Sequence, residues 1–165
     1  MRRALSAVVV LTLVAGAAAM LAQTPSKPNF AGKWTLVPDP NAPAPAGRGR
    51  GMVGGLGQGC SVEQNDKTLT VVNTNQQMGE VKSVYNLDGS ESNNPLSFNG
   101  QSFDRRSKVK WDGSKLVIAT TSNFNGTPIE TTQTWSLDAT GNLMVETTSN
   151  VGGTPTTAKG TYKKG

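Results

Sequence analysis

The pattern of apolar and polar residues is clearest from Trp111 to Leu137, where it alternates with a period of two. It predicts two β-strands that meet at Asn125-Gly126, a pair that favours the positive φ angles of a type I′ hairpin turn. That turn sets three facing pairs, Leu116 with Trp135, Ile118 with Gln133, and Thr120 with Thr131. The hairpin should therefore have one buried face and one face in water.

The same alternation continues along the chain. The sequence TTSNFNGTP at 120–128 returns 27 residues later as TTSNVGGTP at 147–155. We expect Ser90–Ser102 to be a polar loop, with Leu96 and Phe98 turned back toward the core. We expect no helix after the first 22 residues. The remaining predicted strands are Asn29–Val37, Cys60–Gln64, Lys67–Thr74, Glu80–Leu87, Asp104–Trp111, Asn142–Ser149 and Thr154–Lys163.

The expected turns fix a register that can be checked. Turns at Asn65-Asp66, Asp112-Gly113, Asn125-Gly126, 138–141 and Gly152-Gly153 align apolar positions on one face, and a one-residue slip would destroy that agreement. A glycine at 160 would leave room for the Trp135 indole. The first turn pairs Val62 with Leu69 and Cys60 with Val71. The others predict one row of Val109, Leu116, Trp135, Val145 and Gly160, and a second of Leu137, Leu143 and Tyr162.

These elements predict an all-β fold. An antiparallel up-and-down meander with one apolar face buries that face best by closing into a barrel, which also removes its exposed edges. We expect a β-barrel of about 8–9 strands, formed by a single domain at 23–165.

Two segments stand apart from the barrel. Residues 1–22 have the basic start and apolar core of a secretory signal-peptide helix, with cleavage after Ala19 or Ala22. We therefore expect a periplasmic or secreted protein. The loop at 38–59 is rich in Pro and Gly and contains Arg48 and Arg50. It is either a solvated linker or a lid that contacts anions.

Composition narrows the chemistry. The sequence has no histidine, which excludes His-based triads and His-ligated metals. Cys60 is the one cysteine, so it cannot form an internal disulfide, and we expect it to be a buried, inert thiol. The formal net charge is +5, and loss of Arg2 and Arg3 leaves 5 minus 2, or +3. That modest charge argues neither for nor against nucleic acid, which an exported protein seldom meets.

The acidic residues do not predict a catalytic or metal site. Most lie in predicted turns or on the outward face, and the register brings no pair of carboxylates into the barrel. No loop gathers enough acidic oxygens for calcium. We therefore expect no enzyme activity, no cofactor and no metal.

At Gly32-Lys33-Trp34 the chain resembles lipocalins and the wider calycin group, in which a Gly-x-Trp lies on the first strand of an up-and-down barrel. The long loop after that strand also matches in position. The resemblance departs at the end of the chain. Lipocalins place an arginine on a late strand over that tryptophan, where this chain has Lys163 and Lys164, and their C-terminal helix has no counterpart here.

A closer resemblance is to small, uncharacterised exported bacterial proteins. They begin with a Phe-x-Gly-x-Trp strand and contain a hairpin of the form Trp-Asp-Gly-x-x-Leu-x-Ile … Glu-Thr-x-x-Thr-Trp-x-Leu. Here that hairpin starts at Trp111-Asp112-Gly113 and ends at Leu137. The resemblance spans most of Asn29–Lys163 and implies a lipocalin-like barrel in the cell envelope, with no known active site.

The inward face predicts where a ligand would bind. Polar residues gather toward the hairpin tips, and a dry core disfavours such groups unless they are paired. The leading hypothesis is a small amphipathic ligand in the barrel; the alternative is a filled barrel with a structural or protein-interaction role. We expect a monomer that binds no nucleic acid and does not span the membrane, because charges crowd its outward face. The predicted lining is Trp111, Ile118, Thr120, Ile129, Thr131, Gln133, Trp135, Val145, Thr147 and Tyr162, with Trp111 and Trp135 also candidates for plain core.

Overall fold

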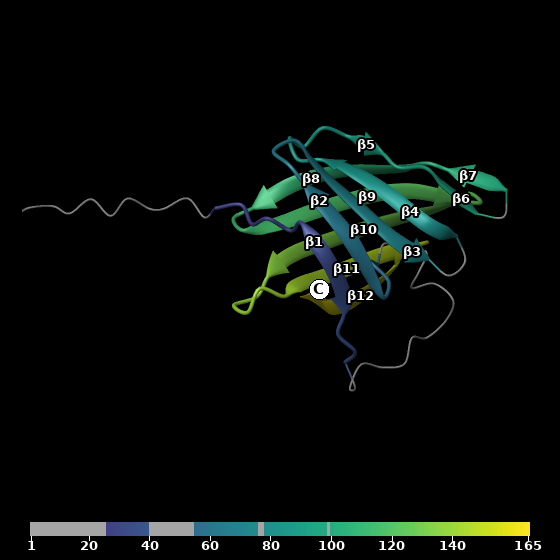
Figure 1. Ribbon diagram of the computed structural model, residues 1–165. Helices are drawn as coiled ribbons and strands as arrows, with labels where there is room; N and C mark the ends of the chain where they lie inside the picture. The colour runs from purple at the N-terminus through teal and green to yellow at the C-terminus, as the bar shows by residue number, and fades with distance from the viewer. Residues whose placement is uncertain (1–25, 40–54, 76–77, 99) are drawn as a thin grey trace, which may run out of the picture.

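Twelve β-strands make up the regular structure of the protein (Figure 1). The computed structural model describes residues 26–39, 55–75, 78–98 and 100–165, and these contain no helix. The signal-peptide prediction for 1–22 and most of the predicted 38–59 loop lie outside the described residues. The strands are β1 (Gly32–Leu36), β2 (Gly59–Gln64), β3 (Thr68–Asn75), β4 (Gly79–Asn86), β5 (Ser92–Asn93), β6 (Leu96–Phe98), β7 (Gln101–Phe103), β8 (Arg105–Asp112), β9 (Lys115–Phe124), β10 (Thr127–Leu137), β11 (Leu143–Val151) and β12 (Thr154–Lys164).

The sheet is an antiparallel meander that curls into a nearly closed barrel (Figure 1). Its 10 strands follow the order β4-β3-β2-β1-β12-β11-β10-β9-β8-β5, and β6 with β7 forms a separate pair. The first and last strands are neighbours, because β1 pairs with β12. The interruption in the ladder therefore falls in mid-chain, between β4 and the β5–β8 edge. The all-β barrel prediction is confirmed at this level.

The predicted loop at 90–102 is wrong in part. It contains the three short strands β5, β6 and β7, and β5 is the addition that brings the barrel sheet to 10 strands. Runs of two or three residues are too short to show a period of two. Leu96 is buried, as expected.

The central hairpin is confirmed. Asn125 has φ 50° and Gly126 has φ 81°, as a type I′ turn requires. The pairings of Leu116 with Trp135, Ile118 with Gln133, and Thr120 with Thr131 are those predicted. The predicted row of Leu137, Leu143 and Tyr162 is also present.

The turn before that hairpin differs from the prediction by one position. Asp112 pairs with Lys115, so Gly113 and Ser114 form the turn, and Gly113 has φ 59°. Glycine at the first central position is typical of a type II′ turn. Trp111, and not Val109, therefore faces Leu116 in the main row, while Val109 faces Ile118. The shift preserves which face each side chain occupies.

The β2–β3 hairpin was also predicted with the wrong pairing. Val62 faces Val71 and Cys60 faces Asn73. Asn65 explains the longer loop, because its side-chain Oδ1 accepts hydrogen bonds from the backbone N of Lys67 at 2.9 Å and of Thr68 at 2.8 Å. This Asx-type turn places Asp66 and Lys67 at the centre of the loop.

The reason given above for Gly160 is wrong as well. A Cβ at this position would lie 2.9 Å from Cε2 of Tyr162 and 3.4 Å from Cδ1 of Leu36. Glycine is needed there because the Tyr162 ring folds over the backbone; the three atoms nearest to such a Cβ belong to Tyr162 and Leu36, and none belongs to Trp135.

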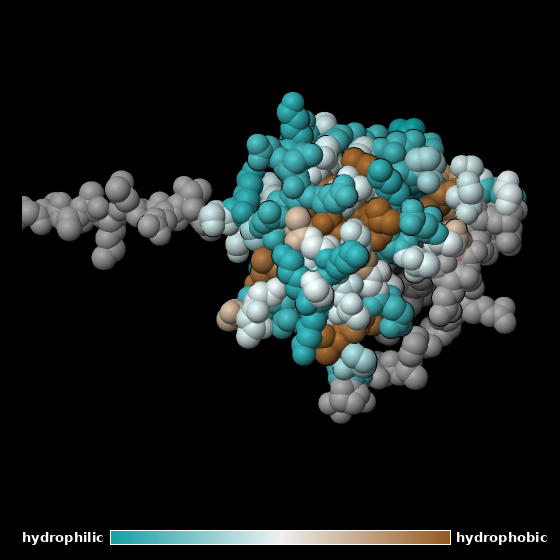
Figure 2. Space-filling model, viewed as in Figure 1, coloured by the Kyte–Doolittle hydropathy of each residue, from teal (hydrophilic) through white to brown (hydrophobic). Residues whose placement is uncertain are grey.

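One apolar core fills the barrel from the β1 side. Phe30, Leu69, Leu116, Trp135 and Leu143 are each 0 % exposed. The outward face is polar, with Lys108 and Lys110 exposed on β8, and Figure 2 shows hydrophilic side chains over much of the viewed face. In the described part of the chain, no helix is long and apolar enough to cross a membrane.

Candidate ligand-binding site

An aromatic cluster closes the end of the barrel where the chain enters β1. The Phe30 ring is stacked on Trp111 at 6.2 Å between centroids and meets Trp135 edge-on at 5.8 Å. The indole Nε1 of Trp34 donates to the carbonyl oxygen of Phe30 at 2.8 Å, which ties the first strand to this cluster. Trp34 is itself buried, with 2 % of its surface exposed.

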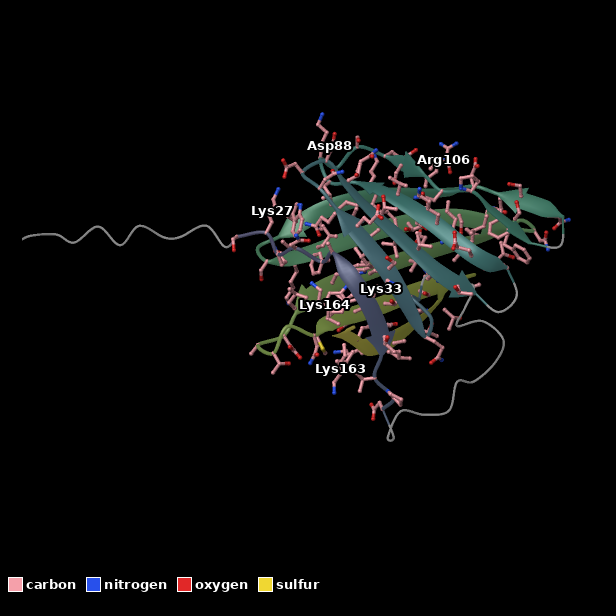
Figure 3. All side chains as sticks on the ribbon, in the orientation of Figure 1. Lys27, Lys33, Asp88, Arg106, Lys163 and Lys164 are labelled. Carbon is pink, nitrogen blue, oxygen red and sulfur yellow. The ribbon has the colours of Figure 1, made fainter. Side chains whose placement is uncertain are left out.

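Two lysines cover the outer side of this cluster (Figure 3). The Nζ of Lys164 lies 5.7 Å from the centroid of the Trp34 ring, and the Nζ of Lys27 lies 5.3 Å from that of Trp111. Both contacts are of the cation–π kind.

Polarity rises in steps away from the aromatic cluster. The row of Trp111, Leu116, Trp135, Val145 and Gly160 is apolar. The next row, Val109, Ile118, Gln133, Thr147 and Ala158, is mixed. The third row consists entirely of hydroxyl side chains, and we call it the hydroxyl row: Ser107, Thr120, Thr131, Ser149 and Thr156.

The hydroxyl row is largely inside the barrel. Ser107, Thr131 and Ser149 are 2 %, 7 % and 7 % exposed. The hydroxyls of Ser107 and Thr120 lie 2.8 Å apart and share a hydrogen bond. In the described part of the chain, no buried hydroxyl of this row lacks a hydrogen-bond partner, so the row forms a polar inward surface whose buried groups are satisfied.

Side chains, and not a backbone ladder, bridge the interruption between β4 and the β5–β8 edge. The Asn94 side chain acts like a peptide group, accepting from the backbone N of Val84 at 2.7 Å and donating to its carbonyl at 3.0 Å. On β8, Arg105 crosses the same gap, donating from Nη2 to Ser83 Oγ at 2.7 Å and from Nε to the Asn94 carbonyl at 3.2 Å. We call this contact the seam.

Arg105 brings a positive charge to the inward side of the barrel. It shares a face with Ser107 and Val109, and it is half-buried. Among the described residues it forms no ion pair, whereas its outward neighbour Arg106 lies 3.8 Å from a Glu91 carboxylate oxygen and 3.9 Å from one of Asp104. Burial lowers the pKa of Arg105, which reflects the cost of a desolvated cation.

Tyr85 lies beside this cation. It is 8 % exposed on the inward face of β4, two residues after Ser83. Burial raises the pKa of Tyr85, and the Arg105 charge partly opposes that rise. A hydrogen bond with the Ser83 side chain opposes the rise as well, and the phenol is neutral near pH 7.

An aromatic pair flanks the polar region at the far end. Phe103 of β7 and Phe124 of β9 meet edge-on at 5.4 Å between centroids, and both are half-buried. Ile129, also half-buried, faces Ser122 next to Phe124. Polar and apolar groups thus occur together at this end of the barrel, opposite the entry of the chain into β1 (Figure 1 and Figure 3).

The structure places the predicted lining residues on one inward face, but at several depths. Ile118, Trp135, Val145 and Tyr162 belong to the apolar core, and Trp111 packs against it. Gln133 is buried and accepts from Trp135 Nε1 at 3.2 Å. The others lie at or beyond the mixed row: Thr120, Ile129, Thr131 and Thr147. Contact of any of them with a ligand stays a prediction.

Sequence reasoning missed the seam residues Ser83, Asn94 and Arg105. A signal for Arg105 was present, since it shares its parity with Val109 and Trp111 and a charge at an inward position is unusual. Nothing local marks Asn94, because its role depends on how two distant strands meet.

Few side chains of the described residues are suited to catalysis or to metal binding. Burial raises the pKa of the Cys60 thiol to about 12, so it is protonated near neutral pH. Within the described ranges, no group of three or more acidic or cysteine side chains is arranged to hold a metal ion.

Comparison with known proteins gives no relative from which to transfer a function. No protein-family model matches the chain, and no curated protein matches it.

Proposed function

We propose that this protein is an exported, non-enzymatic, water-soluble β-barrel that binds a small amphipathic ligand at its polar end. The observation that carries the proposal is the hydroxyl row, which is largely inside the barrel and lies toward the end that holds the Phe103–Phe124 pair. A ligand with one polar and one apolar part would match these two surfaces together.

The contrast between the two ends supports this proposal. The aromatic end is filled by its own side chains, since Phe30 and Trp135 are fully buried against each other. The other end places Thr and Ser where a protein selected for stability alone would gain from Val and Ala. Polar groups kept at such positions are typical of binding sites.

Native mass spectrometry of protein purified from its own source tests the proposal. We expect a mass excess of roughly a few hundred daltons that is lost on denaturation, the mass of a small-molecule ligand. The apo protein should also enhance the fluorescence of the apolar dye Nile red. A native mass equal to the chain mass, together with no dye response, would support the alternative of a filled barrel with a structural role.

Export is proposed from the leader at 1–22 and is tested separately. Sequencing the N-terminus of the protein recovered from the periplasm or medium should find Gln23, or Met20 if cleavage follows Ala19. An intact Met1 on protein confined to the cytoplasm would contradict it.

A further inference from the structure

We propose that Arg105 is an anion receptor, and that the ligand carries a monoanionic carboxylate which binds the Arg105 guanidinium. This inference rests on the proposed function, because it names the chemical class of the molecule bound at the polar end. It begins from the half-buried guanidinium of Arg105, which has no carboxylate partner among the described residues.

The hydrogen bonds of Arg105 leave part of the guanidinium free. A guanidinium has five N–H donors. Within the described residues, two of them are used, by Ser83 Oγ and by the Asn94 carbonyl. Both acceptors are neutral, so neither offsets the charge. The remaining donors include those of Nη1, and a carboxylate can accept two parallel N–H groups from one guanidinium.

Tyr85 and the hydroxyl row complete the receptor. The Tyr85 phenol on β4 lies near the Arg105 charge and hydrogen-bonds with the side chain of Ser83, the residue that also accepts from Arg105. Ser107 lies two residues along β8 on the same inward face. One cation among neutral donors matches one negative charge, which favours a carboxylate over a dianionic phosphate.

Apolar groups lie at the same level of the barrel as Arg105. Arg105 and Ile129 both face Ser122, so they lie in one cross-strand row, directly beyond the hydroxyl row. A carboxylate at Arg105 would therefore leave the apolar tail of the ligand beside Ile129 and the Phe103–Phe124 pair at this end of the barrel.

Three probes of equal chain length test the charge preference. Octanoate, octan-1-ol and octylammonium share one tail and differ in head-group charge, and calorimetric titration at pH 7 measures their affinities. We expect octanoate to bind at least about tenfold more tightly than octan-1-ol, and octylammonium more weakly than either, since charge-assisted hydrogen bonds are stronger than neutral ones. Equal affinity for all three would overturn the anion receptor and leave the proposed function standing. Failure of all three to bind, together with a ligand-free native mass, would overturn both.

Variants identify the residue responsible. Arg105→Gln should weaken octanoate binding at least about tenfold and change octan-1-ol binding by less than about twofold. The matched control is Arg106→Gln, which removes an adjacent exposed guanidinium and should change octanoate affinity by less than about twofold. Should Arg105→Gln unfold, Arg105→Lys keeps the charge and should retain a reduced preference for octanoate. An unchanged preference in folded Arg105→Gln would overturn the assignment.

Discussion

The two ends of this barrel are formed by the same strands but carry different inward side chains, apolar at one end and polar at the other. Along β10, Trp135 is fully buried against Phe30, while Thr131, four residues earlier on the same face, presents a hydroxyl to the interior. The strand pairing is equally regular at both positions. The difference therefore lies in the side chains alone: apolar side chains fill one end, and hydroxyl side chains line the interior at the other.

The largest expected loss of stability comes from a substitution in the packed end. Trp135→Ala deletes a fully buried indole that contacts Phe30, and it should cost about 3–5 kcal/mol of unfolding free energy. A domain of this size holds about 5–15 kcal/mol in total. Urea denaturation followed by circular dichroism measures the loss.

Thr132 provides the control for that variant. Thr132 is an exposed, outward-facing residue on the same strand, so Thr132→Ala should change stability by less than about 0.5 kcal/mol. If both variants lose the same stability, the assignment of inside and outside on β10 is wrong.

A second prediction concerns overpacking at the same end. Gly160→Val places a side chain where a Cβ already meets Tyr162 at 2.9 Å, and should cost about 1–3 kcal/mol. Thermal or urea melts measure the cost. In a Tyr162→Leu background the clash is relieved, so the same substitution should cost less. A cost that does not depend on residue 162 would mean that the ring is not what restricts this position.

Substitutions at the polar end should change the unfolding free energy less. Ser107→Ala breaks the 2.8 Å hydrogen bond with Thr120 and should cost about 0.5–1.5 kcal/mol, a typical value for one buried hydrogen bond. The exposed Ser114→Ala is the matched control, with no expected effect beyond about 0.5 kcal/mol. If Ser107→Ala proved as destabilising as Trp135→Ala, the proposed contrast between the two ends would fail.

The smallest effect is at the β10–β11 loop, where Asp138 organises the turn. Hydrogen bonds from Thr140 and Asn142 lower its pKa to about 2, below the value of about 3.9 for a free aspartate. A lowered folded pKa means that this stabilisation is fully present above about pH 4 and is lost as the pH falls toward 2. NMR titration of the Asp138 carboxyl measures the pKa, and a midpoint near 4 would show that the turn does not hold the charged form. Asp138→Ala should flatten the acid dependence of stability between these values.

The sequence predicts the fold well where turns are governed by one residue pair. Asn125-Gly126 set the central hairpin, and the apolar parity of β9 to β12 followed from it. The prediction failed by a register step at Gly113-Ser114, because two overlapping pairs each contain the glycine. In both hairpins with a wrong turn, the assignment of inward and outward side chains was still correct. A turn shifted by one position changes the pairing by two residues, and side chains alternate with a period of two.

The candidate site was predicted less completely. The inward Thr and Gln positions follow from strand parity, so Thr120, Thr131 and Gln133 were identified. The seam depends on contacts between residues 10 or 22 apart in the chain, such as Val84 with Asn94 and Ser83 with Arg105. No local pattern encodes these contacts, because they arise only when the barrel closes.

The measurement that tests the central claim most directly is an NMR map of where octanoate acts on the protein. Backbone amide shifts are recorded before and after its addition. The account predicts the largest changes at Ser83, Arg105, Ser107 and Thr131, and almost none at Gly32 or Trp34, because the aromatic end is already filled. Changes concentrated around Trp34, or no changes at any concentration up to saturation of the probe, would contradict it.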